Sequence, residues 1–264
     1  MSGGLLLVSS HPDDEVLIAG GTLAACAAAG IETAVVCLTR GEQGPISSPA
    51  LATRATLPAV RDAELNAACS ELGVGAVRCF RRQDGNLRWA DAGAIVRQLV
   101  RILEARRPEA VISFGEDGLY FHPDHIATFQ FTRRAVARMT EPAVLYRSVW
   151  PRTLMPELVQ ELRSRGLPDD LWTLEPEDFG GEDGDDMVVL DVRPFVARKL
   201  RALACHRTQL GPEHAFAALP ADLAERFLGY ERFAPVDGDA HRPNRRLSNG
   251  DRLETLLNSG RVDG

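Results

Sequence analysis

The sequence predicts an α/β fold with a mainly parallel sheet and helices on both of its faces. Two observations lead to this prediction. Short apolar runs of strand length alternate along the chain with longer segments of helical pattern, and this alternation is typical of parallel strands joined by helical crossovers. The apolar runs are also nearly continuous, as expected of strands that are buried on both faces.

Six segments are expected to be strands. The first, Leu5–Ser9, consists of four apolar residues and a serine, which is the pattern of a short buried strand. The others have the same character and occur at Thr33–Leu38, Val77–Phe80, Ala110–Phe114, Val144–Val149 and Met187–Asp191.

Four helices are expected between these strands. The small-residue segment 16–29 stops at Gly30, and the segment 61–72 ends at Gly73, where glycine is a common helix terminator. The segment 94–107 carries an apolar stripe and stops before Pro108. The fourth helix runs from about Ile126 to Met139.

The length and composition fit one domain. The chain has 264 residues, of which 45% are hydrophobic, and this is enough for a single sizeable core. We expect one domain over residues 1–236. The polar, arginine-rich tail over residues 237–264 is expected to be weakly ordered.

Several classes of protein are disfavoured. A net charge of −7 and a pI near 5.4 argue against nucleic acid as a partner. No apolar run is long enough for a membrane span, and Met1–Gly4 is no signal peptide. The five cysteines show no pairing pattern, which favours a reducing cytoplasm. The expected partner is a small molecule, and the oligomeric state is left open.

The most informative segment is His11-Pro12-Asp13-Asp14-Glu15, directly after the first expected strand. It lies at the carboxyl end of a strand and the start of a helix, where α/β sheets place their ligands. Acidic groups this close together repel one another unless a cation lies among them. The segment therefore predicts half of a metal site.

A second segment, Phe121-His122-Pro123-Asp124-His125, predicts the other half. It follows the strand 110–114 and opens a helix, and the two segments contain three of the six histidines. Two histidines and a carboxylate with one open position form the ligand set of a catalytic zinc site, and no Cys-x-x-Cys of a structural zinc site occurs. Either segment alone could be an ordinary helix cap or turn, but their joint occurrence favours metal binding.

Three further features lie outside these motifs. The segment Gly44–Pro58 is expected to be a long loop that lines or covers the site. The acidic segment Glu175–Asp186 is expected to be a solvated loop, since its spacing matches no calcium site. Trp89, Trp150 and Trp172 are isolated in the sequence and are expected in the core or at the rim of the site.

On these two motifs the chain resembles the PIG-L or LmbE-like family of zinc-dependent N-deacetylases. That family carries His-Pro-Asp-Asp-Glu after its first strand and His-x-Asp-His near mid-chain, on a Rossmann-like α/β fold. The likeness covers residues 5–210 and implies removal of acetyl from an N-acetylglucosamine-type amino sugar or its conjugate. Further matching positions are Thr39-Arg40-Gly41-Glu42, Arg61 with Glu64, Asp84-Gly85, Lys199 and His206-Arg207-Thr208-Gln209.

The resemblance implies that His11, Asp14 and His125 are the zinc ligands and that Asp13 is the general base. The chemistry agrees with this assignment. Zinc lowers the pKa of a bound water to about 7, and an unligated carboxylate beside it can accept the proton. Iron(II) could occupy the same nitrogen and oxygen ligands.

The resemblance also implies the surroundings of the reaction. His122 would face the oxyanion as a protonated imidazole, Asp124 would orient a neighbouring group, and Tyr120 would approach the tetrahedral intermediate. Arg61 and Asp84 would hold sugar hydroxyl groups. Either Asp13 or His122 could return a proton to the leaving amine.

Two neighbouring residues are assigned from their positions. Glu15 is expected to orient a neighbour or cap the helix. His206, on an expected helix after Lys199, could donate a hydrogen bond to the site or be an ordinary helix residue.

Three alternatives remain at this stage. Within the same fold, the enzyme could be an amidase that cleaves a larger acyl group, such as that of a mycothiol S-conjugate. A metal-binding protein without turnover is a second alternative. A nucleotide-binding Rossmann-like protein is the third, although no Gly-x-Gly-x-x-Gly follows the first strand.

Overall fold

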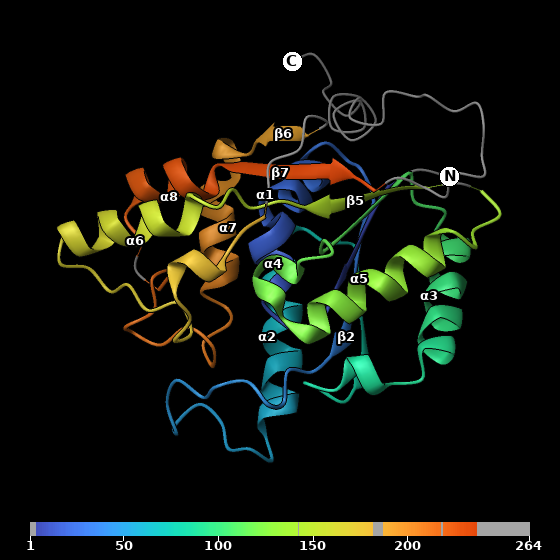
Figure 1. The fold of residues 1–264 in the computed structure, drawn as a ribbon, viewed down its shortest axis with the longest axis horizontal. Helices are drawn as coiled ribbons and strands as arrows, with labels where there is room; N and C mark the ends of the chain where they lie inside the picture. The colour runs from blue at the N-terminus through green and yellow to red at the C-terminus, as the bar shows by residue number, and fades with distance from the viewer. Residues whose placement is uncertain (1–3, 142, 182–186, 218, 237–264) are drawn as a thin grey trace.

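The computed structural model describes residues 4–141, 143–181, 187–217 and 219–236 (Figure 1). The expected tail over residues 237–264 lies outside the described residues, as does the part of the acidic loop at 182–186. No helix in the described part of the chain is long and apolar enough to cross a membrane.

A seven-stranded sheet with the order β3-β2-β1-β4-β5-β7-β6 forms the centre of the molecule. The first five strands run parallel, and β7 is antiparallel to both β5 and β6. The prediction of a mainly parallel sheet is therefore confirmed. The strands are β1 (Leu5–Ser9), β2 (Thr33–Thr39), β3 (Ala76–Arg82), β4 (Ala110–Ser113), β5 (Val144–Ser148), β6 (Val188–Asp191) and β7 (Tyr230–Pro235).

All six expected strands are present, and β7 is the one that the sequence pattern did not predict. Its residue Glu231 points into the protein and is 5% exposed. There the carboxylate accepts a hydrogen bond from buried Lys199 and others from Thr22 and the Gly21 N–H. A buried charge with partners from other elements breaks the apolar pattern on which strand prediction depends.

The helices cover both faces of the sheet (Figure 1). Helices α1, α2 and α7 pack together on one face, and α3 packs against α5 on the other. The four expected helices are present with shifted ends as α1 (Asp14–Ala28), α2 (Leu57–Leu72), α3 (Ala92–Arg106) and α5 (Pro123–Val136). The others are α4 (Gly118–Phe121), α6 (Leu154–Ser164), α7 (Val196–Leu203) and α8 (Ala221–Leu228), with short 3₁₀ turns η1 (Leu87–Trp89), η2 (Pro176–Asp178) and η3 (Arg193–Phe195).

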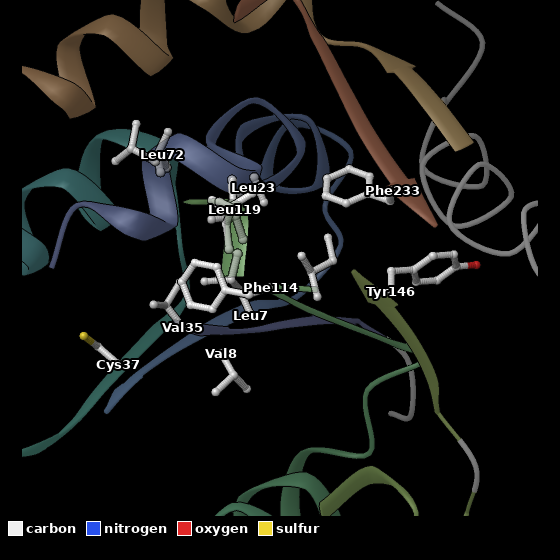
Figure 2. Close-up of a cluster of buried hydrophobic side chains, with 14 of the residues drawn as sticks. Leu7, Val8, Leu23, Val35, Cys37, Leu72, Phe114, Leu119, Tyr146 and Phe233 are labelled. Atoms are coloured by element: carbon white, nitrogen blue, oxygen red, sulfur yellow. The ribbon is translucent and has the colours of Figure 1, made fainter. Parts of the chain in front are cut away.

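The core surrounds the central strands (Figure 2). Leu7 and Val8, neighbours on β1, are both fully buried, although successive strand residues point to opposite faces. Phe114 after β4 and Tyr146 on β5 are also fully buried. Both faces of the middle of the sheet are therefore covered by apolar side chains.

The strand order places the two histidine motifs together. β1 and β4 are adjacent and parallel, with Leu5 opposite Ala110 and Leu7 opposite Ile112. The chain leaves β1 toward β2 on one side and leaves β4 toward β5 on the other, which makes the gap between them the switch point of the sheet. In open α/β sheets, ligands bind at this point, outside the carboxyl ends of the strands.

Candidate active site

Three donor groups converge at the switch point, as the sequence predicts. His11 Nδ1 lies 3.2 Å from His125 Nε2, and Asp14 lies 3.3 Å from His125 Nε2 through Oδ1 and 3.5 Å from His11 Nδ1 through Oδ2. All three side chains are buried. Zinc–nitrogen bonds of about 2.0–2.1 Å in a tetrahedral site would separate neighbouring ligand atoms by roughly 3.3 Å. The separation of the two imidazole nitrogens matches that spacing, whereas Asp14 approaches them through two different oxygens. Among the described residues, His122 also offers a ring nitrogen within reach of those of His11 and His125.

The polar contacts behind the two imidazoles decide which nitrogen faces the centre. His125 Nδ1 lies 3.0 Å from the Gly118 carbonyl oxygen, which can only accept, so Nδ1 carries the proton. His11 Nε2 lies 3.0 Å from Asp84 Oδ1 and 3.5 Å from Asp124 Oδ2, and the two carboxylates favour a proton there. The remaining nitrogens then point lone pairs at each other and at Asp14. Such a set requires a cation between its members, and second contacts of this kind are typical of metal-bound histidines.

The electrostatics of His11 and Asp14 support the same conclusion. Burial opposes a charge on His11, but the Asp124, Asp14 and Asp84 carboxylates outweigh it and raise the pKa of His11 well above its usual range. Burial likewise opposes ionisation of Asp14, yet the two imidazoles hold the pKa of that carboxyl well below its usual range. The protein without metal therefore keeps a proton where a metal ion would fit, and the donor set suits a zinc or iron(II) ion.

Asp13 lies beside these groups and is held in a strained conformation. Its φ of 117° and ψ of −32° lie in a region that residues with side chains rarely adopt, and such outliers are typical of functional sites. Its backbone N–H donates to Glu15 Oε2 at 2.9 Å, and its Oδ2 accepts from Arg61 Nη2 at 2.9 Å. Burial, partly offset by Arg61, raises the pKa of Asp13 to about 6. The carboxyl group is thus ionised at neutral pH and close to the pKa that suits a general base.

Glu15 holds Asp13 from behind. Its Oε1 lies 2.7 Å from His206 Nε2, and neither side chain is exposed to solvent. Burial opposes a charge on His206, but the Glu15 carboxylate raises the pKa of that imidazole. Glu15 therefore orients its neighbour, as expected. α7 ends at Leu203, and His206 lies in the turn that follows it. The prediction that His206 lies on a helix was therefore wrong.

His122 differs from the imidazolium expected from the sequence. Burial first, and then the neighbouring His125 and His11, lower the pKa of His122 to about 4, so that the ring is neutral at pH 7. Its ring stacks on His125 with 4.5 Å between centroids. Nδ1 accepts a hydrogen bond from the Asp124 N–H at 3.2 Å, at the start of α5. The ring proton is therefore on Nε2, which remains free to donate.

Tyr120 lines the same cavity, and the backbone on either side of it is strained. Leu119 and Phe121, on either side of it in α4, have positive φ angles of 66° and 58°. The Tyr120 ring meets the rings of His122 and His125 edge-on, with centroids 5.6 and 5.2 Å apart. Phe121 faces outward and is 68% exposed.

The two residues assigned to sugar hydroxyls line the cavity but are engaged by the protein. Arg61 donates to the Gly41 carbonyl oxygen at 2.8 Å, to the Pro12 carbonyl oxygen and to Asp13. Asp84 contacts His11 through Oδ1 and accepts the Gln43 N–H through Oδ2 at 2.8 Å. Burial opposes its ionisation, but His11 lowers the pKa of Asp84 to about 2. Sugar binding by these two residues stays a prediction.

Asp124 orients its surroundings. Its two carboxylate oxygens accept hydrogen bonds from the Gly85 N–H at 2.7 Å and the Leu87 N–H at 3.0 Å. These bonds fix the loop that carries Asp84 against His11. The role that the resemblance implies for Asp124 is therefore compatible with its contacts.

The donor groups open into a cavity of about 320 Å³. The expected long loop contributes only Gly44 and Pro45 to its lining. Sequence reasoning missed Gln43 and Gln209 as lining residues. Gln209 lies in a segment that matches the family and Gln43 directly follows another, which was the available signal. It also left the aromatic wall of the cavity, Trp150, Trp172 and Phe179, without a role.

Comparisons with known proteins agree with the fold and the motifs. Residues 6–136 match the family described as GlcNAc-PI de-N-acetylase, PIG-L. The chain is 34% identical to the 1D-myo-inositol 2-acetamido-2-deoxy-α-D-glucopyranoside deacetylase of Acidothermus cellulolyticus, over 91% of both chains. It is 33% identical to the protein of the same name from Mycolicibacterium smegmatis, over 89% of this chain and 91% of that one.

Solved structures show the same fold. N,N'-diacetylchitobiose deacetylase from Pyrococcus horikoshii superposes with a TM-score of 0.66 at 19% identity, covering 93% of this chain and 88% of that one. Teicoplanin deacetylase Orf2, in its zinc-inhibited form, superposes with a TM-score of 0.61 at 19% identity, covering 90% and 99%. At this level of identity the likeness concerns the fold.

Proposed function

The chain belongs to the PIG-L family of de-N-acetylases, and from that premise we propose that it is a zinc-dependent deacetylase of N-acetylglucosamine joined to an inositol. The curated relatives named above carry this activity in their names, and each is matched over most of its length. The reaction is hydrolysis of the amide bond, which gives acetate and a free amino sugar.

The observation that carries the proposal is the spacing of the three donor groups together with the tautomers of the two histidines. His11 Nδ1, His125 Nε2 and the Asp14 carboxylate would hold the metal, leaving a position open toward the cavity. Zinc bound there would supply a Lewis acid and an activated water at neutral pH. Iron(II) suits the same nitrogen and oxygen donors.

Asp13 acts as the general base. Its carboxylate takes a proton from the water that attacks the acetyl carbon, and Arg61 on its Oδ2 fixes its orientation. A pKa of about 6 lets the group accept this proton and release it again near neutral pH. Asp13 therefore also returns the proton to the amine as the amide bond breaks.

His122 acts as a neutral hydrogen-bond donor. With Nδ1 occupied by the Asp124 N–H, its Nε2–H faces the cavity and can donate to the amide oxygen as negative charge develops there. Tyr120 lies at the edge of the same rings and approaches that oxygen from the apolar side. A neutral His122 cannot be the acid for the amine, which supports Asp13 in that role.

Two further assignments belong to the proposal. The single catalytic domain extends over residues 1–236. The five cysteines are all free, which fits work in a reducing cytoplasm on a small-molecule substrate. An amidase for larger acyl groups is not favoured, because the relatives named above are deacetylases.

The proposal is tested by acetate release from synthetic N-acetylglucosaminyl-α-1-myo-inositol. Enzyme stripped by chelation and reloaded with one equivalent of zinc should release acetate and a primary amine in equal amounts. The chelated enzyme and the His125→Ala variant should not. The absence of acetate from the zinc-loaded wild type would refute the assignment, and faster release of a longer acyl group would favour the amidase.

A further inference from the structure

The cavity has an apolar wall that the proposed chemistry does not use. The proposed catalytic and metal-binding groups share the cavity with a set of apolar side chains, namely Leu17, Leu119, Trp150, Trp172, Leu174 and Phe179. Hydrolysis of an acetyl group needs no such wall. An apolar surface beside convergent polar groups is typical of a ligand-binding cavity and accommodates the part of a substrate that does not react.

Trp172 is held at this wall by a strained backbone. Trp172 and Thr173 are consecutive residues with positive φ angles of 53° and 63°, a conformation that residues with side chains seldom adopt twice in succession. Neighbouring bonds maintain it: Thr173 N–H donates to Asp170 Oδ1 at 3.0 Å, and Asp170 N–H donates to the Glu213 carbonyl oxygen at 3.1 Å. Strain that the surroundings maintain is a reason to look for a function at that position.

The loop that carries His214 packs against the Trp172 ring. The isolated bridge between Asp170 and His214 joins the two loops, and the Ala215 N–H donates to the Asp170 carbonyl oxygen at 2.9 Å. The Trp172 and His214 rings meet at an angle of 61° with centroids 4.2 Å apart. His214 is itself buried and fixed through Nδ1, which accepts the Phe216 N–H. The half-buried Trp172 is thus set in one orientation with part of its surface left open.

Phe179 and Trp150 connect the wall to the proposed catalytic residues through Tyr120. Phe179 lies 5.1 Å from the Tyr120 ring and 6.1 Å from the Trp150 ring, centroid to centroid. The Gly180 N–H donates to the Leu119 carbonyl oxygen at 2.8 Å, and the Gly181 N–H donates to the Trp150 carbonyl oxygen at 3.0 Å. These bonds tie the aromatic wall to α4, which carries Tyr120. A group bound along the wall would therefore be adjacent to the reacting amide.

The described part of the lining offers no built site for a phosphate group at this wall. Among the described residues that line the cavity, the one side chain with a permanent positive charge is Arg61, and its partners are Asp13 and two backbone carbonyls. Asp13, Asp14 and Asp84 add carboxylates. Phosphate sites need free cationic groups or backbone N–H groups, and the apolar wall offers no free cationic side chain among its described residues.

From these observations we propose that Trp150, Trp172 and Phe179 form a subsite for an uncharged six-membered ring attached to the N-acetylglucosamine, and that Trp172 determines specificity for it. A pyranose or cyclitol ring carries C–H faces between its hydroxyl groups. Such a face fits an indole, whose apolar body packs against it and whose N–H can meet a hydroxyl. The inference rests on the proposed deacetylase function and names the part of the substrate that the reaction leaves unchanged.

The test compares two substrates that differ only in the ring: N-acetylglucosamine and its α-glycoside of myo-inositol. For the wild type, kcat/KM for acetate release should be at least about tenfold higher with the glycoside, the scale of one good aromatic contact. Trp172→Ala should remove most of this preference, because it should raise KM for the glycoside far more than KM for N-acetylglucosamine. Trp172→Phe should keep a large part of the preference.

The matched control is Trp89→Ala. Trp89 is 74% exposed on η1 and is not among the residues that line the cavity, so its loss should alter neither substrate. The metal content and the thermal unfolding of each variant show whether it is folded. If Trp172→Ala is misfolded, the substrate preference of Trp172→Phe tests the subsite instead. Equal losses on both substrates in a folded Trp172 variant, or no preference in the wild type, would overturn the subsite.

A third substrate tests the charge argument. The same glycoside with a phosphate on its inositol should have a kcat/KM at least about tenfold below that of the neutral glycoside, because the wall offers no free cation. Equal or better turnover of the phosphorylated substrate would overturn the assignment of the subsite to an uncharged ring. If the wild type is inactive on every one of these substrates, the deacetylase function itself is refuted. This outcome distinguishes a failure of the proposed function from a failure of the proposed subsite.

Discussion

Replacement of Glu15 by alanine tests how the protein holds its proposed base. The Glu15 carboxylate accepts the Asp13 N–H at 2.9 Å and lies 2.7 Å from His206 Nε2, with no solvent exposure. Breaking a buried pair by removing one partner costs about 3–5 kcal/mol. Because His206 can release its proton once Glu15 is gone, we expect the lower end, about 3 kcal/mol at pH 7.5.

The same variant should lose activity through Asp13. Without an acceptor for its N–H, the strained φ of 117° is no longer maintained, and displacement of a reacting group by about 1 Å can cost about 10²-fold in rate. Glu15→Gln keeps an acceptor for the Asp13 N–H while removing the charge. It should therefore retain more kcat than Glu15→Ala although it is also destabilised.

The assay is urea unfolding of chelated protein, so that metal binding does not alter the comparison, together with acetate release from the reloaded enzyme. Glu71→Ala is the matched control, since Glu71 pairs with Arg201 at 3.0 Å on the surface and exposed pairs contribute under about 1 kcal/mol. A Glu15→Ala variant as stable as this control, with wild-type kcat, would refute the role of Glu15.

Three further predictions concern the catalytic groups. Asp13→Asn should keep its metal by elemental analysis but lose at least about 10²-fold in kcat; loss of metal would make Asp13 a ligand. Asp13 must be ionised to act as a base, and its pKa is about 6 without metal. A bound cation favours the carboxylate and lowers this pKa. We therefore expect kcat/KM to fall as the pH drops through 6 and into the range just below it. A profile that stays flat down to pH 4.5 would contradict this. His122→Ala should lower kcat by about 10²-fold, as for loss of an oxyanion donor, without removing any alkaline limb from the pH profile. Disappearance of such a limb in that variant would indicate an imidazolium.

The central strands could be predicted because burial on both faces leaves a signal in a few consecutive residues. Leu5–Ser9 has the same bounds in the sequence analysis and in the structure. β7 could not be found in this way, since Glu231 is stabilised by Lys199 from α7 and by Thr22 from α1. The signal for α6 was present in the helical spacing of its buried residues Met155, Leu158, Val159 and Leu162.

The proposed metal ligands could be suggested from two short motifs, because each motif follows a strand and the two strands are neighbours. The protonation state of each of these groups could not be predicted from the sequence. The tautomer of His125 depends on the Gly118 carbonyl oxygen, and that of His11 depends on Asp84. The neutral state of His122 results from burial beside two other imidazoles, and only the tertiary structure brings His11 there.

The most direct test of the account is the metal content of histidine variants. Elemental analysis should find one zinc or iron ion per chain in the wild type, and none in His11→Ala or His125→Ala. His122→Ala, from the same motif as His125, should keep its full complement, because a fourth protein ligand would close the catalytic position. Full metal in His125→Ala, or loss of metal in His122→Ala alone, would contradict the assignment of the site.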